Sequence, residues 1–225
     1  FLKSDPNHEL VSFVILRMAD RILIAGMLTM ESLVYYALAY ALYEHIKMFI
    51  ASLYEVITPR ISERISRIEN LKDIAGEMEY QTRILFGIIL YLNANAFIFS
   101  GLFFYILPKF GHSVEIFRIL IVSLSVALFA MYPSLLINSK RVGKAAVLSA
   151  FTVVSSLINV GLCYTLILNG YGIMGVAAGT LVSNVAMTAL CYFYIHRHIL
   201  EKSLSPAYFG WLLCPPGIFG ALYIF

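Results

Sequence analysis

Charged residues are scarce in this sequence. Of its 225 residues, 13% are Asp, Glu, Lys or Arg, whereas 60% are hydrophobic. A soluble domain carries about 25% charged residues, so this share is too small to cover a water-soluble globule. A disordered chain is excluded as well, because such chains are poor in hydrophobic residues. The uncharged stretches also exceed the ~10-residue alternating strands of a membrane barrel. The composition therefore predicts an all-α membrane protein, a polytopic bundle of transmembrane helices.

Cysteine pairs and catalytic motifs are missing too. The three cysteines, Cys163, Cys191 and Cys214, lie in apolar stretches without a CxxC pair, which predicts buried thiols and no disulfide or metal framework. His8-Glu9 does not continue into HExxH, and there is no P-loop. We therefore expect no metal, no cofactor, no ATP hydrolysis and no enzyme activity.

Seven stretches are long enough to cross a bilayer, which takes about 20 apolar residues. The interval 145–195 holds no charged residue and is long enough for two crossings, divided by the turn signal at 169–172. The predicted spans are 10–28, 33–58, 84–108, 119–139, the two halves of 145–195, and 207 to the end.

Basic residues alternate between the connecting loops. Counted loop by loop, the second, fourth and sixth loops each hold more Lys and Arg than the loop before them. Because positive loops stay in the cytoplasm, we place 59–83, 139–144 and 196–206 there. The net charge of +3 thus indicates topology and not nucleic-acid binding, and we expect a multi-pass protein of the cytoplasmic (inner) membrane.

The segment 59–83 is the one long polar stretch. Its apolar residues recur at helical spacing among charges of both signs, which predicts an amphipathic cytoplasmic helix along the membrane surface. Two interpretations stay open: a solvated connector, or a surface for a partner or regulator.

Several charges fall inside the first two predicted helices. A charge at the bilayer centre costs about 2.5–3.5 kcal/mol on insertion scales, so these residues are expected to face protein or a wet cavity. One interpretation is a substrate cavity for an anionic or polyhydroxylated molecule, in which arginine grips phosphate and a carboxylate couples to an ion. The other is internal pairing, Arg17 with Asp20 and Glu44 with Lys47. The candidate cavity residues are Arg17, Asp20, Arg21, Glu44 and Lys47.

Small residues in the later spans predict helix packing. Asn93 and Ser100 share one helix face, and Thr152, Ser155, Ser156 and Asn159 share another; such residues commonly join membrane helices. Gly175 and Gly179 form a small-xxx-small pair for close packing. Pro133 predicts a kink in the fourth span.

Several motifs resemble one transporter family. These are ADRILIAG at 19–26, YYALA at 35–39, ITPRIS at 57–62, PSLLINSKRVGK at 133–144 and NGYGIMGVAAGT at 169–180. In this order they resemble the polysaccharide (O-antigen-type) flippases of the multidrug/oligosaccharidyl-lipid/polysaccharide exporter superfamily.

This resemblance implies a two-lobe exporter, of which residues 1–225 would be the second, C-terminal lobe, truncated at both ends and lacking the N-terminal lobe. It implies transport of polyprenyl-pyrophosphate-linked oligosaccharide across the membrane by alternating access, with a coupling ion (Na+ or H+) in place of ATP. Membrane lipid would be a further partner. The cavity would contain Arg17, Asp20 and Arg21.

Other functions remain open. A cation-coupled multidrug antiporter of the same superfamily is the nearest alternative, although two arginines against one aspartate in the first helix favour an anionic substrate. A lipid II flippase is a variant of the first interpretation. An integral membrane polymerase would be expected to show a large external loop, and the predicted outer loops are short.

Overall fold

The computed structural model describes residues 18–67, 74–139, 143–199 and 217–219, and every element in these ranges is a helix. Residues 18–27 form a helical segment that we call the first helix. The others are α2 (Met30–Arg67), α3 (Ile74–Ile106), the short 3-10 helix η1 (Pro108–Phe110), α4 (Ser113–Phe129), α5 (Met131–Asn138), α6 (Ala145–Leu168), α7 (Gly172–Tyr194) and the π-helical turn η2 (Ile195–Ile199). The predicted all-α class is confirmed.

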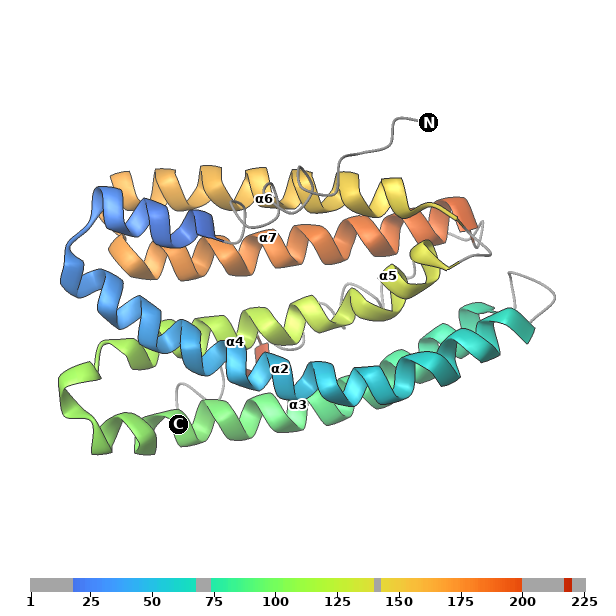
Figure 1. The fold of residues 1–225 in the computed structure, drawn as a ribbon, viewed down its shortest axis with the longest axis horizontal. Coiled ribbons are helices and arrows are strands. Elements are labelled where there is room, and N and C mark those ends of the chain that lie inside the picture. The colour runs from blue at the N-terminus through green and yellow to red at the C-terminus, as the bar shows by residue number, and fades with distance from the viewer. Residues whose placement is uncertain (1–17, 68–73, 140–142, 200–216, 220–225) are drawn as a thin grey trace.

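The long helices lie roughly parallel and antiparallel to one another in a bundle (Figure 1). Helix α7 packs against both α6 and α4, and α4 in turn packs against α2 and α3. The first helix lies beside α7 at one end of the bundle (Figure 1). This arrangement puts α4 in the middle, where its residues are the most consistently buried of any helix.

Four of the seven predicted spans are confirmed as helices long and apolar enough to cross a membrane. By length and composition alone, four helices of the described chain could cross a membrane: Tyr80–Ile106, Ser113–Asn138, Ala145–Leu168 and Gly172–Ile199. Gly170 and Gly172, both with positive φ, form the predicted turn between the last two. Residues 10–17 and most of the seventh span lie outside the described residues.

The second predicted span is part of a longer helix. Helix α2 has 38 residues, about 57 Å at about 1.5 Å per residue, which exceeds the ~30 Å hydrocarbon core. It continues through Pro59 to Arg67. The predicted 59–83 connector therefore consists of the end of α2 and the start of α3, with 68–73 between them outside the described residues.

The fourth span begins earlier than predicted and is broken near its end. Arg118, assigned to a loop from the sequence, lies within α4, where its guanidinium is 3.5 Å from Glu115 and 5.0 Å from the Phe97 ring centre. These neighbours accommodate the charge. The break falls at Ala130, and Pro133, the third residue of α5, has no N–H to donate to the carbonyl four residues earlier. The kink predicted at Pro133 is thus confirmed (Figure 1).

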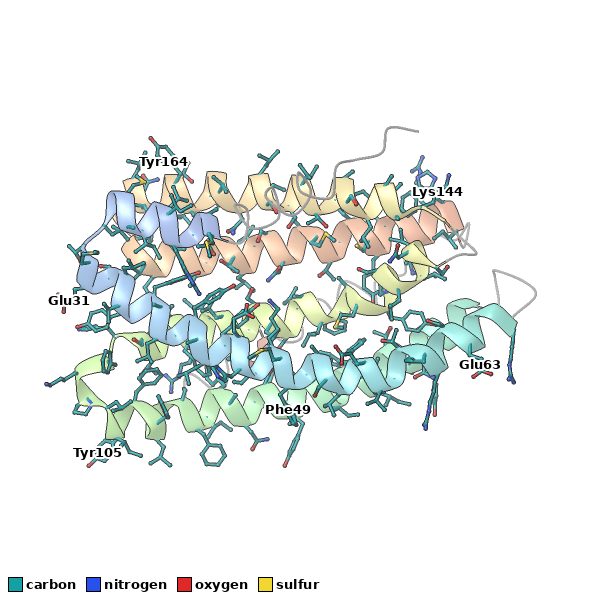
Figure 2. The ribbon with its side chains drawn as sticks, viewed as in Figure 1. Glu31, Phe49, Glu63, Tyr105, Lys144 and Tyr164 are labelled. Carbon is teal, nitrogen blue, oxygen red and sulfur yellow. The ribbon has the colours of Figure 1, made fainter. Side chains whose placement is uncertain are left out.

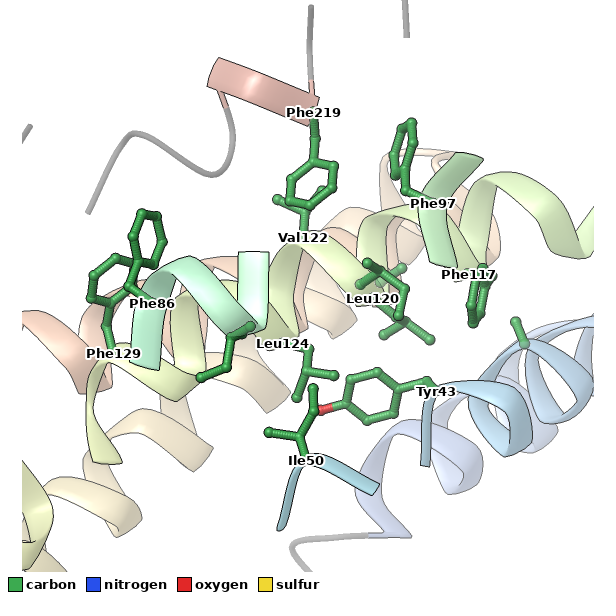
Figure 3. Close-up of a cluster of buried hydrophobic side chains, with 14 of the residues drawn as sticks. Tyr43, Ile50, Phe86, Phe97, Phe117, Leu120, Val122, Leu124, Phe129 and Phe219 are labelled. Carbon is green, nitrogen blue, oxygen red and sulfur yellow. The ribbon is translucent and has the colours of Figure 1, made fainter. Parts of the chain in front are cut away.

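The core lies where α2, α3 and α4 meet. Tyr43 and Ile50 of α2 face Leu120 and Leu124 of α4 (Figure 3). On the α3 side, the rings of Phe86 and Phe129 lie 4.3 Å apart between centres.

The outside of the bundle is also apolar. Phe49, Tyr105 and Tyr164 project from the bundle (Figure 2), with 56%, 83% and 48% of their surfaces exposed. Such outward-facing apolar residues are numerous on α2, α3 and α6. A soluble monomer seldom exposes large contiguous apolar patches, so this surface agrees with a membrane protein.

Small polar residues join the helices as predicted. Asn93 Nδ2 donates to Ser125 Oγ across α3 and α4 at 2.8 Å, and Ser155 Oγ donates to the Ser183 carbonyl across α6 and α7 at 2.8 Å. Thr152, by contrast, donates to the Leu148 carbonyl of its own helix at 3.0 Å. The predicted packing of the glycine pair is confirmed, because a Cβ built on Gly175 or Gly179 would lie 2.8 or 2.7 Å from a side-chain atom of α6.

Candidate functional site

The most distinctive polar feature of the described chain is the buried carboxylate of Asp20, which is only 8% exposed. It accepts hydrogen bonds from three other helices. Its donors are Tyr36 Oη at 3.0 Å and Thr180 Oγ1 at 3.2 Å to Oδ2, and Asn159 Nδ2 at 2.9 Å and Cys163 Sγ at 3.9 Å to Oδ1. We call this set the Asp20 cluster. It joins the first helix to α2, α6 and α7.

Helical periodicity and one glycine assemble the Asp20 cluster. Asn159 and Cys163 are four residues apart and so share one face of α6. Gly179 of α7 lies directly against them, since a Cβ at this position would lie 2.7 Å from Cys163 Sγ and 3.4 Å from Asn159 Oδ1. This close approach of α7 to α6 brings the next residue, Thr180, within reach of the same carboxylate.

All donors of the Asp20 cluster are neutral. Burying a carboxylate in a membrane helix is costly, and such groups are usually paired with a cation or mark an ion or proton pathway. Within the described ranges, Asp20 takes part in no salt bridge. The carboxylate oxygens, together with the oxygen atoms of Asn159 and Thr180, offer the hard ligands that cations such as Na+ prefer. The cluster thus brings several such oxygen atoms together around one buried carboxylate.

Arg21 lies on the other side of the first helix. Its side chain is exposed, and its guanidinium carbon lies 4.8 Å from the ring centre of Tyr40 on α2. Adjacent helical residues point about 100° apart, which explains how neighbouring residues reach the interior and the surface. The guanidinium on the tyrosine face is thus held by a cation–π contact while the side chain stays exposed.

The pairing predicted between Glu44 and Lys47 is present. Lys47 Nζ lies 3.0 Å from Glu44 Oε1, with side chains 32% and 27% exposed. Lys47 also lies 5.5 Å from the ring centre of Tyr43. The two charges neutralise each other, and both side chains are half-buried, as is Tyr40.

The five candidate cavity residues thus divide into three groups. Asp20 is buried, Arg21 lies at the surface on Tyr40, and Glu44 pairs with Lys47 further along α2. Arg17 lies outside the described residues, so its predicted pairing with Asp20 does too.

Sequence reasoning overlooked the partners of Asp20. Asn159 was assigned to helix packing, and no role was given to Thr180 or to the Cys163 thiol. Tyr36 enters the sequence analysis only as part of the motif at 35–39. The i, i+4 spacing of Asn159 and Cys163 was a visible signal, but pairing them with residue 20 needs the three-dimensional arrangement.

Comparisons of the chain with protein-family models, with curated proteins and with solved structures find no match.

Replacing Thr180 with valine is expected to destabilise the protein by about 1.5–3 kcal/mol, the net contribution of a hydrogen bond to a charged group. Valine keeps the shape but loses the donor. The free energy of unfolding, measured by SDS titration in mixed micelles, tests this. Thr180→Ser should retain most of the stability. Thr165→Val is the matched control, since the Thr165 hydroxyl bonds only to carbonyls of its own helix; an equal loss there would contradict the role of the Asp20 bond.

Proposed function

We propose that the protein is an ion-coupled secondary transporter that moves polyprenyl-pyrophosphate-linked oligosaccharide across the cytoplasmic membrane by alternating access. The observation that carries this proposal is the Asp20 carboxylate, buried among neutral donors from three other helices. A purely structural site would be served as well by a neutral side chain. A charge at this position is explained by a cation or proton that binds and leaves.

The surface next to Asp20 supports an anionic substrate. Arg21 presents a planar set of donors suited to bidentate contact with phosphate oxygens. Tyr40, half-buried beneath the Arg21 guanidinium, adds an aromatic ring to this surface. Lys47 lies further along α2, paired with Glu44. Together these residues form a cationic and aromatic strip along α2, which we call the Arg21–Lys47 strip.

The test is deletion of the gene from its host, followed by measurement of lipid-linked oligosaccharide on the cytoplasmic side and of glycan on the cell surface. Deletion is expected to raise the first and lower the second, and the wild type to restore both. Arg21→Gln is expected to restore less than about a tenth of surface glycan, because it removes a charged hydrogen-bond donor. Arg197→Gln is the matched control, since Arg197 is likewise exposed and lies over an aromatic ring, 5.8 Å from that of Phe193.

One outcome would replace this proposal by its nearest alternative. The Asp20 cluster serves equally well in a cation-coupled multidrug antiporter, because both transporters need a coupling carboxylate. Unchanged glycan in the deletion strain, together with new sensitivity to cationic dyes, would overturn the flippase and favour the antiporter.

A further inference from the structure

A chain of contacts links the buried carboxylate of Asp20 to the exposed guanidinium of Arg21. The Tyr36 hydroxyl donates to Asp20 Oδ2 at 3.0 Å. The Tyr36 ring stacks on Tyr40, with ring centres 5.9 Å apart and planes at 24°. Arg21 in turn lies over Tyr40, 4.8 Å from its ring centre. Although Asp20 and Arg21 are sequence neighbours on different sides of one helix, two tyrosines of α2 connect their side chains.

We propose that Tyr36 and Tyr40 are positioning residues that couple the charge of the Asp20 carboxylate to anion binding at Arg21. This inference rests on the proposed function, in which a cation binds at the Asp20 cluster and an anionic substrate binds on the Arg21–Lys47 strip. The Tyr36 hydroxyl and the stack of the Tyr36 and Tyr40 rings then control anion binding on that strip.

The mechanism follows from the hydrogen bond of Tyr36. While Asp20 is ionised, its charge strengthens the bond from the Tyr36 hydroxyl and fixes the Tyr36 ring, which is fully buried. That ring holds Tyr40, and Tyr40 holds the guanidinium against its face. A cation or proton at Asp20 takes up the carboxylate charge and weakens the bond. The stack is then free to shift, and the guanidinium can turn toward an anion.

The electrostatic effect of Asp20 acting directly through space gives a competing explanation. The negative charge of Asp20 opposes anion binding at Arg21 through space, whatever lies between them. Substitution of Tyr36 by phenylalanine separates the two explanations. It removes the hydroxyl that carries the link but leaves the charges of Asp20 and Arg21, and the aromatic ring, in place.

The experiment measures the Kd of farnesyl pyrophosphate for the purified protein in lipid nanodiscs. In the wild-type background, Asp20→Asn is expected to tighten binding at least about fivefold, the lower end of usual coupling between sites. In the Tyr36→Phe background the same substitution should change the Kd less than about twofold, because the hydroxyl that bonds to Asp20 is absent. Tyr40→Leu, which removes the stack, should give the same result.

Tyr35→Phe is the matched control. The Tyr35 hydroxyl donates to Glu31 at the surface, away from Asp20, so this variant should keep the full wild-type response to Asp20→Asn. A full response in both Tyr36→Phe and Tyr40→Leu would overturn the proposal and leave direct electrostatics as the explanation. A wild type that binds the probe but ignores Asp20→Asn would overturn it too, with the proposed function intact. A wild type that does not bind the probe would overturn both.

Discussion

Replacing Asp20 with asparagine is expected to lower the affinity for the coupling cation about a thousandfold while the protein stays folded. A carboxylate and a monovalent cation about 4 Å apart attract each other by about 4 kcal/mol at an effective dielectric constant of 20, which corresponds to that factor. Cation affinity is measured by isothermal titration with Na+ at several pH values. Transport of lipid-linked oligosaccharide in cells should fall in parallel.

The fold should survive because of which donors face each oxygen of Asp20. Asn159 Nδ2 and the Cys163 thiol donate to Oδ1, which an asparagine can supply as its carbonyl oxygen. Tyr36 and Thr180 approach Oδ2 with hydroxyl groups, and a hydroxyl accepts a hydrogen bond as readily as it donates one. An asparagine amide therefore fits the cluster in one orientation.

Asp20→Leu is the contrasting variant. It removes the acceptor of the Tyr36 hydroxyl and of the Asn159 amide, and each buried donor left unpaired costs about 1–3 kcal/mol. We expect Asp20→Leu to be poorly folded, whereas Asp20→Asn unfolds near the wild-type temperature. A folded Asp20→Asn protein that transports and binds Na+ normally would contradict the role of Asp20 in coupling.

The apolar helices could be predicted from the sequence because their signal is local. The run 145–195 has no charge, and its division at Gly170 and Gly172 follows from the need for positive φ in that turn. The start of α4 was placed too late because Arg118 resembles a loop residue. Its neighbours Glu115, Phe97 and Ser100, two of them on another helix, make the charge acceptable inside α4.

The Asp20 cluster could be predicted only in part. Asp20 itself was selected because a charge in an apolar helix is costly. Its partners are 16, 139, 143 and 160 residues away along the chain, and no periodicity connects such distant positions. The sequence also does not predict that Asp20 is buried while Arg21 is exposed, because this difference depends on which side of the first helix α7 covers.

Replacing Gly179 with valine is expected to destabilise the protein by at least about 3 kcal/mol, at the upper end of the usual cost of overpacking. A Cβ at this position would lie 2.7 Å from Cys163 Sγ and 3.3 Å from the Cys163 backbone nitrogen. The sulfur can move slightly, but the backbone of α6 cannot move without separating α6 from α7. Unfolding in mixed micelles measures the loss, and cation binding should weaken as Cys163 and Asn159 are displaced from Asp20.

Gly161→Val is the matched control on the neighbouring helix. Gly161 is exposed, and a Cβ there would meet nothing within 4 Å, so its substitution should change stability by less than about 1 kcal/mol. The double variant Gly179→Ala with Cys163→Ala separates the two contacts. It removes the sulfur and should recover part of the stability lost in Gly179→Ala alone, because only the backbone contact then remains. Equal losses at Gly161 and Gly179 would show that the close approach of α7 to α6 does not depend on glycine.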